Sequence, residues 1–201
     1  TTPMSYLHLA EEPRVVVIVT PICTADPACA TRGQQQASAV VAEVAGPARS
    51  VLRAERVALN LVQRQSGIAT TTAAHVAAVR AGGGHARVVD TRKTTPGLRV
   101  LERQAVRDGG GHNHRFSLSD AVMLKDNHVW STGSITNAVE AARRAAGFSL
   151  RIDVEVQSKA EAEEAIRAGA DVVMLDNMTG DELVACARSL KGELGGAHRF
   201  L

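Results

Sequence analysis

Aromatic residues are scarce in this sequence, since phenylalanine, tryptophan and tyrosine together make up 2% of its 201 residues. Proteins that bind single-stranded nucleic acids stack the bases on aromatic side chains, so this composition argues against such a surface. An excess of charge of one sign is absent too: 23 basic and 21 acidic residues give a formal net charge of +2. Dedicated nucleic-acid-binding domains are usually more basic, with clustered cations. We therefore expect no nucleic-acid partner.

Cysteines and long apolar runs are also rare. The three cysteines (Cys23, Cys29 and Cys186) form an odd, unpatterned set, which argues against the disulfide framework of a small secreted protein. The longest purely apolar run covers only residues 15–19, whereas a membrane-spanning helix needs roughly 20 residues. No secretory signal opens the sequence. We expect a cytoplasmic protein without membrane contact.

Lysine is the rarer of the two cationic residues, with 4 lysines beside 19 arginines. Two of the four, Lys93 and Lys125, fall inside the most motif-like stretches of the sequence. Lysine supplies a compact point charge, whereas arginine supplies a planar fork of donors. This scarcity indicates positions where an ammonium group is specifically required. The remaining composition, 45% hydrophobic and 22% charged, is that of an ordinary globular protein.

The first 36 residues lack the regular pattern of the rest. They contain one candidate strand, residues 15–20, between prolines, and we interpret the segment as a loose or atypical extension. A second candidate strand, residues 39–46, ends in glycine. Apolar spacing then predicts a helix over residues 55–80, broken or bent at Ser66-Gly67.

Strands and helices alternate in the second half of the sequence. The predicted strands are residues 87–90, 121–124, 150–156 and 172–175, and helices are predicted at 98–106, 136–146, from Ser158 to Gly169, and up to Leu190. Four consecutive βα units predict a parallel sheet with right-handed crossovers. The residues alone leave open whether this is a doubly wound sheet or a barrel. Four units cannot close a barrel, so we expect open edges at the first and fourth strands.

Charged residues follow the predicted strands in a regular way. They are Asp90, Arg92 and Lys93 after the first, Lys125 and Asp126 after the second, Asp153 and Glu155 in the third, and Asp176 after the fourth. The carboxyl ends of parallel strands share one mouth, where active sites are built. We therefore expect these side chains to converge on one cavity.

A glycine run adds further cations to this set. Gly109, Gly110 and Gly111 permit backbone conformations that other residues avoid, and His114 and Arg115 follow closely. An imidazole beside a guanidinium suits a polycarboxylate or a phosphate. We expect His112 to face solvent and the second glycine run, residues 82–84, to be a turn.

The sequence gives less indication of a metal site than of an anion-binding site. No zinc-type cluster occurs in the sequence. The carboxylates of Glu155 and Asp176 fit Mg²⁺, which one or two acids hold together with substrate phosphates.

Six motifs together resemble one enzyme family. They are ERVALNLVQRQSGIAT at 55–70, DTRKTTPGLR at 90–99, GGGHNHR at 109–115, KDNH at 125–128, DVEV at 153–156 and AGADVVMLDN at 168–177. In this order they resemble quinolinate phosphoribosyltransferase, the decarboxylating enzyme also called nicotinate-nucleotide pyrophosphorylase. The TRKTTPG loop and the KDNH turn are nearly diagnostic.

The resemblance implies an N-terminal α/β sandwich domain followed by an open α/β barrel. Residues 37–80 then correspond to the end of the sandwich domain and its connecting helices, and residues 81–201 to a truncated barrel. Residues 1–36 stay unassigned. The expected fold class is therefore α/β, with βα repeats forming part of an open barrel behind a remnant of the sandwich domain.

The resemblance also implies a reaction. Quinolinate and phosphoribosyl pyrophosphate combine with the help of Mg²⁺ to give nicotinate mononucleotide, pyrophosphate and CO₂, a step of NAD biosynthesis. The implied substrate-binding residues are Arg56, Arg92, Lys93, His114, Arg115 and Lys125. The implied catalytic residues are Lys93, Lys125, Glu155 and Asp176, and Glu155 and Asp176 also lie near the metal. Arg56 matches an arginine that reaches a neighbouring subunit's site, so a homodimer or higher homo-oligomer is implied.

The sequence departs from the family at both ends. Residues 1–36 do not resemble the N-terminal domain, and the sequence stops at AHRFL, where the family continues into loops that bind the ribose phosphate. From this we expect weakened or absent turnover. Two alternatives stay open: a related phosphoribosyltransferase paralogue, and a quinolinate-binding or interaction module without turnover.

Overall fold

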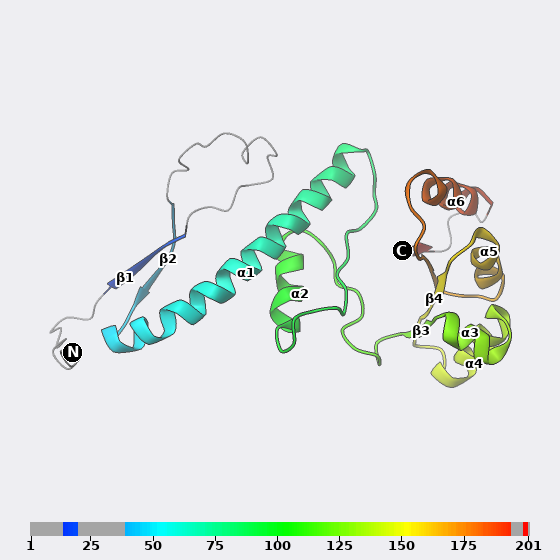
Figure 1. Ribbon diagram of the computed structural model, residues 1–201, viewed down its shortest axis with the longest axis horizontal. Helices are drawn as coiled ribbons and strands as arrows, with labels where there is room; N and C mark the ends of the chain where they lie inside the picture. The colour runs from blue at the N-terminus through cyan, green and yellow to red at the C-terminus, as the bar shows by residue number, and fades with distance from the viewer. Residues whose placement is uncertain (1–13, 20–38, 194–198, 201) are drawn as a thin grey trace. The chain divides into compact units, whose positions relative to one another are not determined.

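The computed structural model describes residues 14–19, 39–193 and 199–200 (Figure 1). They fall into two compact units, and the chain passes from the first to the second between His114 and Arg115. The boundaries expected from the sequence, after residues 36 and 80, follow the family resemblance and stay a prediction.

Unit 1 begins with an antiparallel strand pair. β1 (Arg14–Val19) pairs with β2 (Ala39–Ala45), and the register shifts between Val17 and Ile18. Both strands were predicted, and the structure confirms them for residues 15–19 and 39–45. The strand expected within the N-terminal segment is therefore formed, and its backbone is paired with β2. The rest of residues 1–36 lies outside the described residues.

One long helix dominates unit 1. α1 (Ala48–Ala81) runs for 34 residues from Pro47 to Gly82. The predicted start at residue 55 and the break at Ser66-Gly67 are both wrong, because the helix continues through these positions. A glycine inside a helix costs only about 0.5–1 kcal/mol relative to alanine. The helix-forming residues on both sides of Gly67 outweigh that cost.

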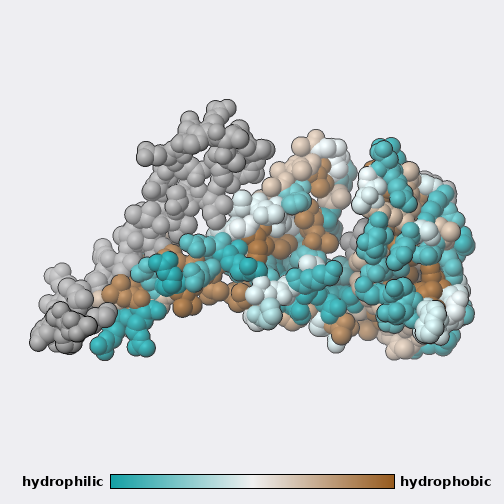
Figure 2. Space-filling view, viewed as in Figure 1, coloured by the Kyte–Doolittle hydropathy of each residue, from teal (hydrophilic) through white to brown (hydrophobic). Residues whose placement is uncertain are grey.

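The surface of α1 is only partly covered. Thr72 is its one buried residue among those described, and α2 (Arg99–Asp108) lies against the helix (Figure 1). Apolar side chains remain exposed toward the N-terminal end of α1, and brown atoms lie along this part of the helix in Figure 2. Leu52 is 56% and Val57 62% exposed. Within the described part of the chain, no helix is both long and apolar enough to cross a membrane.

The predicted strand at residues 87–90 is not formed. Only an isolated parallel bridge joins Val89 to His112. Its two hydrogen bonds run from the His112 N–H to the Val88 carbonyl (2.8 Å) and from the Asp90 N–H to the His112 carbonyl (3.1 Å). The apolar stretch, Val88-Val89, is short, and its partner is the segment after the glycine run. The first of the four expected βα units therefore has a bridge in place of its strand.

Unit 2 contains the predicted parallel sheet. Its strands lie in the order β3 (Val122–Leu124), β4 (Ile152–Val156), β5 (Val172–Leu175) and β6 (Arg199–Phe200). The helices are α3 (Asp126–Thr132), α4 (Ile135–Ala146), α5 (Lys159–Arg167) and α6 (Gly180–Glu193). The expected open edge at the strand of residues 172–175 is wrong, because β6 pairs with β5.

The two faces of this sheet differ in chemistry. Ile152, Val154 and Val156 of β4 are fully buried in the hydrophobic cluster, which includes residues of α4, α5 and α6. Since side chains alternate along a strand, Asp153 and Glu155 point to the opposite face. The sheet thus buries its apolar face under helices, while on the other face Asp153 is buried and Glu155 is partly exposed.

Serine side chains fix the starts of two helices in unit 2. The Ser134 Oγ accepts a hydrogen bond from the Asn137 N–H, and the Ser158 Oγ accepts one from the Glu161 N–H. The Glu161 carboxylate in turn accepts a bond from the Gln157 N–H (2.8 Å). The predicted start of a helix at Ser158 is confirmed. Such caps satisfy N–H groups that a helix leaves open.

Ile152→Ala tests the core of unit 2. Ile152 is 0% exposed, and truncating such a side chain costs about 2–5 kcal/mol because a cavity remains. We expect that loss of unfolding free energy in urea titrations followed by far-UV circular dichroism. Phe148→Ala is the control, because Phe148 is fully exposed; equal stability of both variants would contradict the described core.

Candidate functional site

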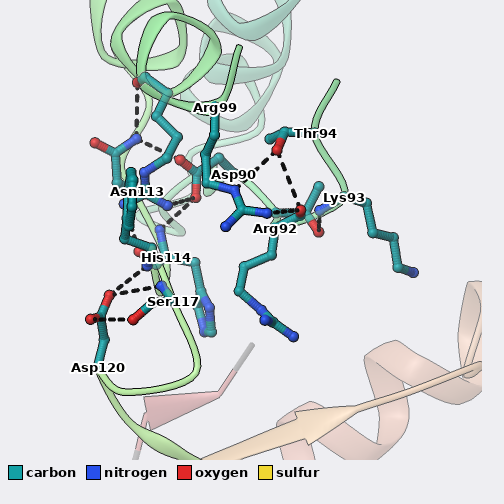
Figure 3. Close-up of polar contacts among 12 residues, drawn as sticks. Asp90, Arg92, Lys93, Thr94, Arg99, Asn113, His114, Ser117 and Asp120 are labelled. Carbon is teal, nitrogen blue, oxygen red and sulfur yellow. Dashed lines mark hydrogen bonds and ion pairs between the residues drawn. The ribbon is translucent and has the colours of Figure 1, made fainter. Parts of the chain in front are cut away.

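Two cations of unit 1 stand on one loop. Arg92 and Lys93 lie between the bridge at Val89 and α2, Lys93 exposed and Arg92 half-buried. Neither side-chain cation has a hydrogen bond or ion pair to another described residue, and Figure 3 shows both extending away from the loop. Unpaired cations on a fixed backbone favour binding of an anion.

The backbone of this loop is held by Arg99, the first residue of α2. Its Nε donates to the Thr94 Oγ1 (3.1 Å) and its Nη2 to the Arg92 carbonyl (3.1 Å) (Figure 3). Arg99 therefore fixes the backbone from which the Arg92 side chain extends.

A buried carboxylate holds the other end of the loop. Glu102, 8% exposed, accepts hydrogen bonds from the Arg64 Nε (2.8 Å) and the Thr95 N–H (3.2 Å). Burial by itself raises the pKa of Glu102, but the hydrogen bonds from Thr95 and Arg64, with the charge of Arg64, bring it below its ordinary value. The ionised form of Glu102 therefore ties α1, α2 and the loop together.

Asp90 is turned inward. The sequence predicted that it faces a common mouth with the substrate-binding cations. Instead its carboxylate, 5% exposed, accepts hydrogen bonds from Arg103 (3.1 Å), the Asn113 amide (2.5 Å) and the His114 N–H (2.7 Å). That expectation is wrong for Asp90, because these donors all lie within unit 1 and take up the carboxylate.

The glycine run before His114 packs closely on α1. Gly110 has a φ of +82°, which favours glycine. A Cβ on Gly111 would lie 2.7 Å from the Thr72 Cγ2 and 2.8 Å from the Val106 Cγ1. Glycine is thus required here for shape as well as conformation. The predictions of an exposed His112 and of a turn at residues 82–84 are confirmed.

Arg115, the first residue of unit 2, is 7% exposed. Its Nη1 donates to the Ala121 carbonyl (3.2 Å), and its Nη2 lies 2.9 Å from the Met123 Sδ on β3. The structure therefore anchors this guanidinium on β3, and its role toward a substrate stays a prediction.

Lys125 and Glu155 meet at the carboxyl ends of β3 and β4. The Lys125 Nζ lies 2.6 Å from the Glu155 Oε2, with the lysine side chain 46% and the glutamate 16% exposed. The backbone N–H of Lys125 donates to the His128 Nδ1 (3.0 Å), which fixes the KDNH turn at the start of α3. Convergence of charges at strand ends is thus observed for this pair.

Asp176 follows β5 in a strained turn. Its N–H donates to the Val156 carbonyl (2.9 Å), and its carboxylate accepts a bond from the Asn177 amide (2.7 Å). Asn177 has a φ of +58°, which is uncommon for a residue other than glycine. The hydrogen bond to the Val156 carbonyl ties Asp176 to the end of β4.

Metal ligands were predicted at Glu155 and Asp176. No cluster of three or more histidine, cysteine or acidic residues suited to a metal occurs in residues 14–19, 39–193 and 199–200. The carboxylates present fit Mg²⁺ only in its usual mode, with one or two acids and the remaining ligands from water and substrate oxygens.

A groove of about 430 Å³ adjoins Glu155 in unit 2. Its lining includes Asp126, Trp130, Gln157 and Glu161, and Trp130 is 88% exposed. Arg56, in contrast, lies on the exposed surface of α1 in unit 1, with no ion pair to any described residue. Its predicted role in a neighbouring subunit stays a prediction.

A parallel βα sheet with charged residues at its strand ends is typical of a domain of the α/β-barrel class. A profile described as "Quinolinate phosphoribosyl transferase, C-terminal domain" matches residues 68–196. The chain belongs to this family, as its six motifs predicted.

Curated relatives support this assignment. The chain is 53% identical over 142 residues to the probable nicotinate-nucleotide pyrophosphorylase [carboxylating] of Bacillus subtilis, covering 71% of this chain and 48% of the relative. It is 50% identical over 153 residues to the human nicotinate-nucleotide pyrophosphorylase [carboxylating], covering 76% and 52%. The chain thus spans about half the length of these relatives.

Solved structures agree on the fold. NadC from Streptococcus pyogenes superposes with a TM-score of 0.74 at 43% identity, covering 93% of this chain and 61% of that one. The enzyme from Francisella tularensis, titled as nicotinate-nucleotide pyrophosphorylase, gives 0.71 at 37% identity, covering 88% and 60%. The expected fold class, part of an α/β barrel preceded by a remnant of a further domain, is confirmed.

Sequence reasoning missed the residues that hold the site in place. Arg64, Arg99, Glu102 and Arg103 were not singled out, although all four contact the loops that bear Arg92 and His114. One available signal was the cluster of Arg99, Glu102 and Arg103 on one helical turn, directly after the TRKTTPG loop.

Gly111→Ala tests the close packing of the glycine run. The new Cβ would overlap Thr72 and Val106, so we expect a loss of about 1–3 kcal/mol in unfolding free energy. Gly67→Ala is the matched control, because a Cβ there meets nothing within 4 Å and alanine favours the helix by about 0.5–1 kcal/mol. Thermal unfolding of both variants measures this, and destabilisation by Gly67→Ala or stability of Gly111→Ala would refute it.

Glu102→Gln tests the charge of the buried carboxylate. Because the folded-state pKa of Glu102 is lowered, its contribution is full above the ordinary glutamate pKa and disappears as the pH falls through the folded-state pKa. We expect a loss of about 1 kcal/mol at neutral pH, since solvent screens the half-exposed Arg64. At acidic pH the variant and the unaltered chain should converge. Urea titrations across this range measure the difference, and one independent of pH would contradict the assignment.

Proposed function

We propose that this chain serves the quinolinate phosphoribosyltransferase reaction, in which quinolinate and phosphoribosyl pyrophosphate give nicotinate mononucleotide, pyrophosphate and CO₂. The observation that carries the proposal is the loop of Arg92 and Lys93, whose cations have no partner among the described residues. Family membership supports it. The names of the relatives favour this reaction over that of a related paralogue.

Substrate binding follows from the charge of quinolinate, a pyridine with two adjacent carboxylates. In unit 1, Arg92, Lys93 and His114 supply cationic or hydrogen-bonding groups, and in unit 2 Arg115 and Lys125 do the same. Arginine binds a carboxylate through two parallel hydrogen bonds, whereas lysine acts as a point charge. A substrate with two carboxylates therefore gains more from Arg92 and Lys93, which share one loop of unit 1, than one with a single carboxylate.

Phosphoribosyl transfer depends on unit 2. The bond from the ribose C1 to pyrophosphate breaks, the quinolinate nitrogen bonds to that carbon, and the ribose becomes oxocarbenium-like. Glu155 and Asp176 stabilise this positive centre. The phosphates of phosphoribosyl pyrophosphate compete with Glu155 for Lys125. They can do so because a partly exposed ion pair stabilises by only about 0–1 kcal/mol. Glu155 and Asp176 would hold Mg²⁺, which would supply positive charge to neutralise the leaving pyrophosphate.

Decarboxylation needs no further cofactor. After transfer the ring nitrogen is positively charged, and the adjacent carboxylate leaves as CO₂ while its bonding electrons stay on the ring carbon. The positive nitrogen stabilises these electrons, and a proton then adds to the carbon. The protein's part is to hold the substrate by its remaining carboxylate.

The proposal extends to assembly and location. A homodimer or higher homo-oligomer is supported by the exposed position of Arg56 on α1, which leaves its guanidinium accessible to a neighbouring subunit. A cytoplasmic location is supported by the unpatterned cysteines.

Thermal unfolding of the full 201-residue chain with quinolinate and Mg²⁺ tests the proposed function. Ligands that bind only the folded state raise the midpoint, by about 2.7 kcal/mol of stability at 100 times the dissociation constant. We expect a rise with quinolinate and a smaller one with nicotinate, which has a single carboxylate.

Arg92→Gln should abolish most of the rise with quinolinate, because it removes one unpaired cation of the loop. Arg144→Gln is the matched control, since Arg144 is an exposed arginine of α4 whose Glu140 partner is 3.9 Å away. Equal shifts with nicotinate and quinolinate, or no shift with either, would refute the proposal.

A further inference from the structure

We infer that the buried Asp90–Arg103 pair is a positioning device that holds the main chain of His114 and thereby sets the affinity for quinolinate. The inference rests on the proposed function, which makes His114 a substrate-binding residue. Neither Asp90 nor Arg103 is proposed to touch the substrate. Their effect passes through the backbone that bears the imidazole.

The pair forms hydrogen bonds to both the main-chain N–H and the main-chain carbonyl of His114. The Asp90 Oδ1 accepts from the His114 N–H (2.7 Å), and the Arg103 Nη2 donates to the His114 carbonyl (2.9 Å). The same Oδ1 accepts from the Arg103 Nη1 (3.1 Å). The ion pair and the His114 main chain thus form a closed ring of hydrogen bonds, which fixes the residue's orientation as well as its position.

A neighbouring amide reinforces this ring. The Asn113 Nδ2 donates to the Asp90 Oδ2 (2.5 Å) and to the Arg103 carbonyl (2.9 Å) (Figure 3). Both oxygens of the carboxylate are therefore used inside unit 1. The Asp90 and Arg103 side chains are only 5% and 12% exposed, so water screens the pair weakly.

The pair also joins His114 to the loop of Arg92 and Lys93. Asp90 is two residues before Arg92, and its N–H donates to the His112 carbonyl (3.1 Å). Main-chain and side-chain contacts of one residue therefore align the two segments that bear Arg92, Lys93 and His114. A carboxylate ligand that bridges these segments depends on their spacing, and small misplacements at such sites reduce function by one to two orders of magnitude.

Arginine is required at position 103 because its contacts need two separate nitrogens. The guanidinium reaches Asp90 through Nη1 and the His114 carbonyl through Nη2. A lysine keeps the positive charge but has a single nitrogen on a shorter reach, so it cannot reproduce this fork. Arg103→Lys therefore separates the geometric role of the side chain from its charge.

The test measures quinolinate affinity by calorimetry and amide hydrogen exchange of His114 by NMR, both on the full 201-residue chain. For Arg103→Lys we expect an affinity about tenfold lower or weaker still, as is typical when a supporting partner of a binding residue is lost. We also expect faster exchange of the His114 amide. Asp90→Asn should change both in the same direction, and it keeps the test usable if Arg103→Lys fails to fold.

Arg143→Lys is the matched control. The Arg143 Nη2 donates to the Gly169 carbonyl (2.8 Å) and to Asp171 (2.9 Å), so it also joins an aspartate to a backbone carbonyl, but within unit 2. We expect it to lower the thermal midpoint while leaving quinolinate affinity and His114 exchange unchanged. An equal affinity loss in this control would mean that general destabilisation explains the effect, and would overturn the inference.

The remaining outcomes separate this inference from the proposed function. If the unaltered chain binds quinolinate and Arg103→Lys binds it equally well, the positioning role is refuted and the proposed function stands. If the unaltered chain binds no quinolinate, the proposed function fails and the inference fails with it.

Discussion

The carboxylate of Asp90 accepts hydrogen bonds from a guanidinium, a side-chain amide and a main-chain N–H, and it thereby joins α2 to the segment that contains His114. A buried carboxylate is costly unless it is paired, so the loss of any of these donors destabilises unit 1. The glycine run ending at Gly111 lets the chain approach α1 closely enough for this pairing. The same requirement fixes the loop of Arg92 and the segment of His114 together.

The same principle is found in each unit: buried groups fix the backbone, and charged side chains remain available. In unit 1 a paired acid holds the backbone while the Arg92 and Lys93 cations stay available to a ligand. In unit 2 a hydrophobic cluster holds one face of the sheet while Glu155 lies on the other. Rigid supports beneath exposed charge reduce the entropy lost on binding. The proposed reaction, which binds a highly charged substrate pair, benefits from both.

The sequence failed at particular places for physical reasons. Residues 87–90 were expected to form a strand, but the segment forms one bridge, because pairing depends on which partner tertiary packing supplies. The break predicted at Gly67 does not occur, because one glycine is a weak perturbation in a long helix. Arg99 and Arg103 were overlooked because surface and anchoring arginines look alike in a sequence. Only their contacts distinguish them.

The sequence by itself determined the family, through six ordered motifs, and the parallel βα order of unit 2, through alternating strand and helix periodicity. These are local patterns, and periodicity encodes which face of an element is buried. Only the tertiary structure decided which charged residues are available and which are occupied. It turned Asp90 inward, anchored Arg115 on β3 and left Arg92 and Lys93 without partners among the described residues. The physical reason is that the state of a charge depends on neighbours far away in sequence, which no local pattern specifies.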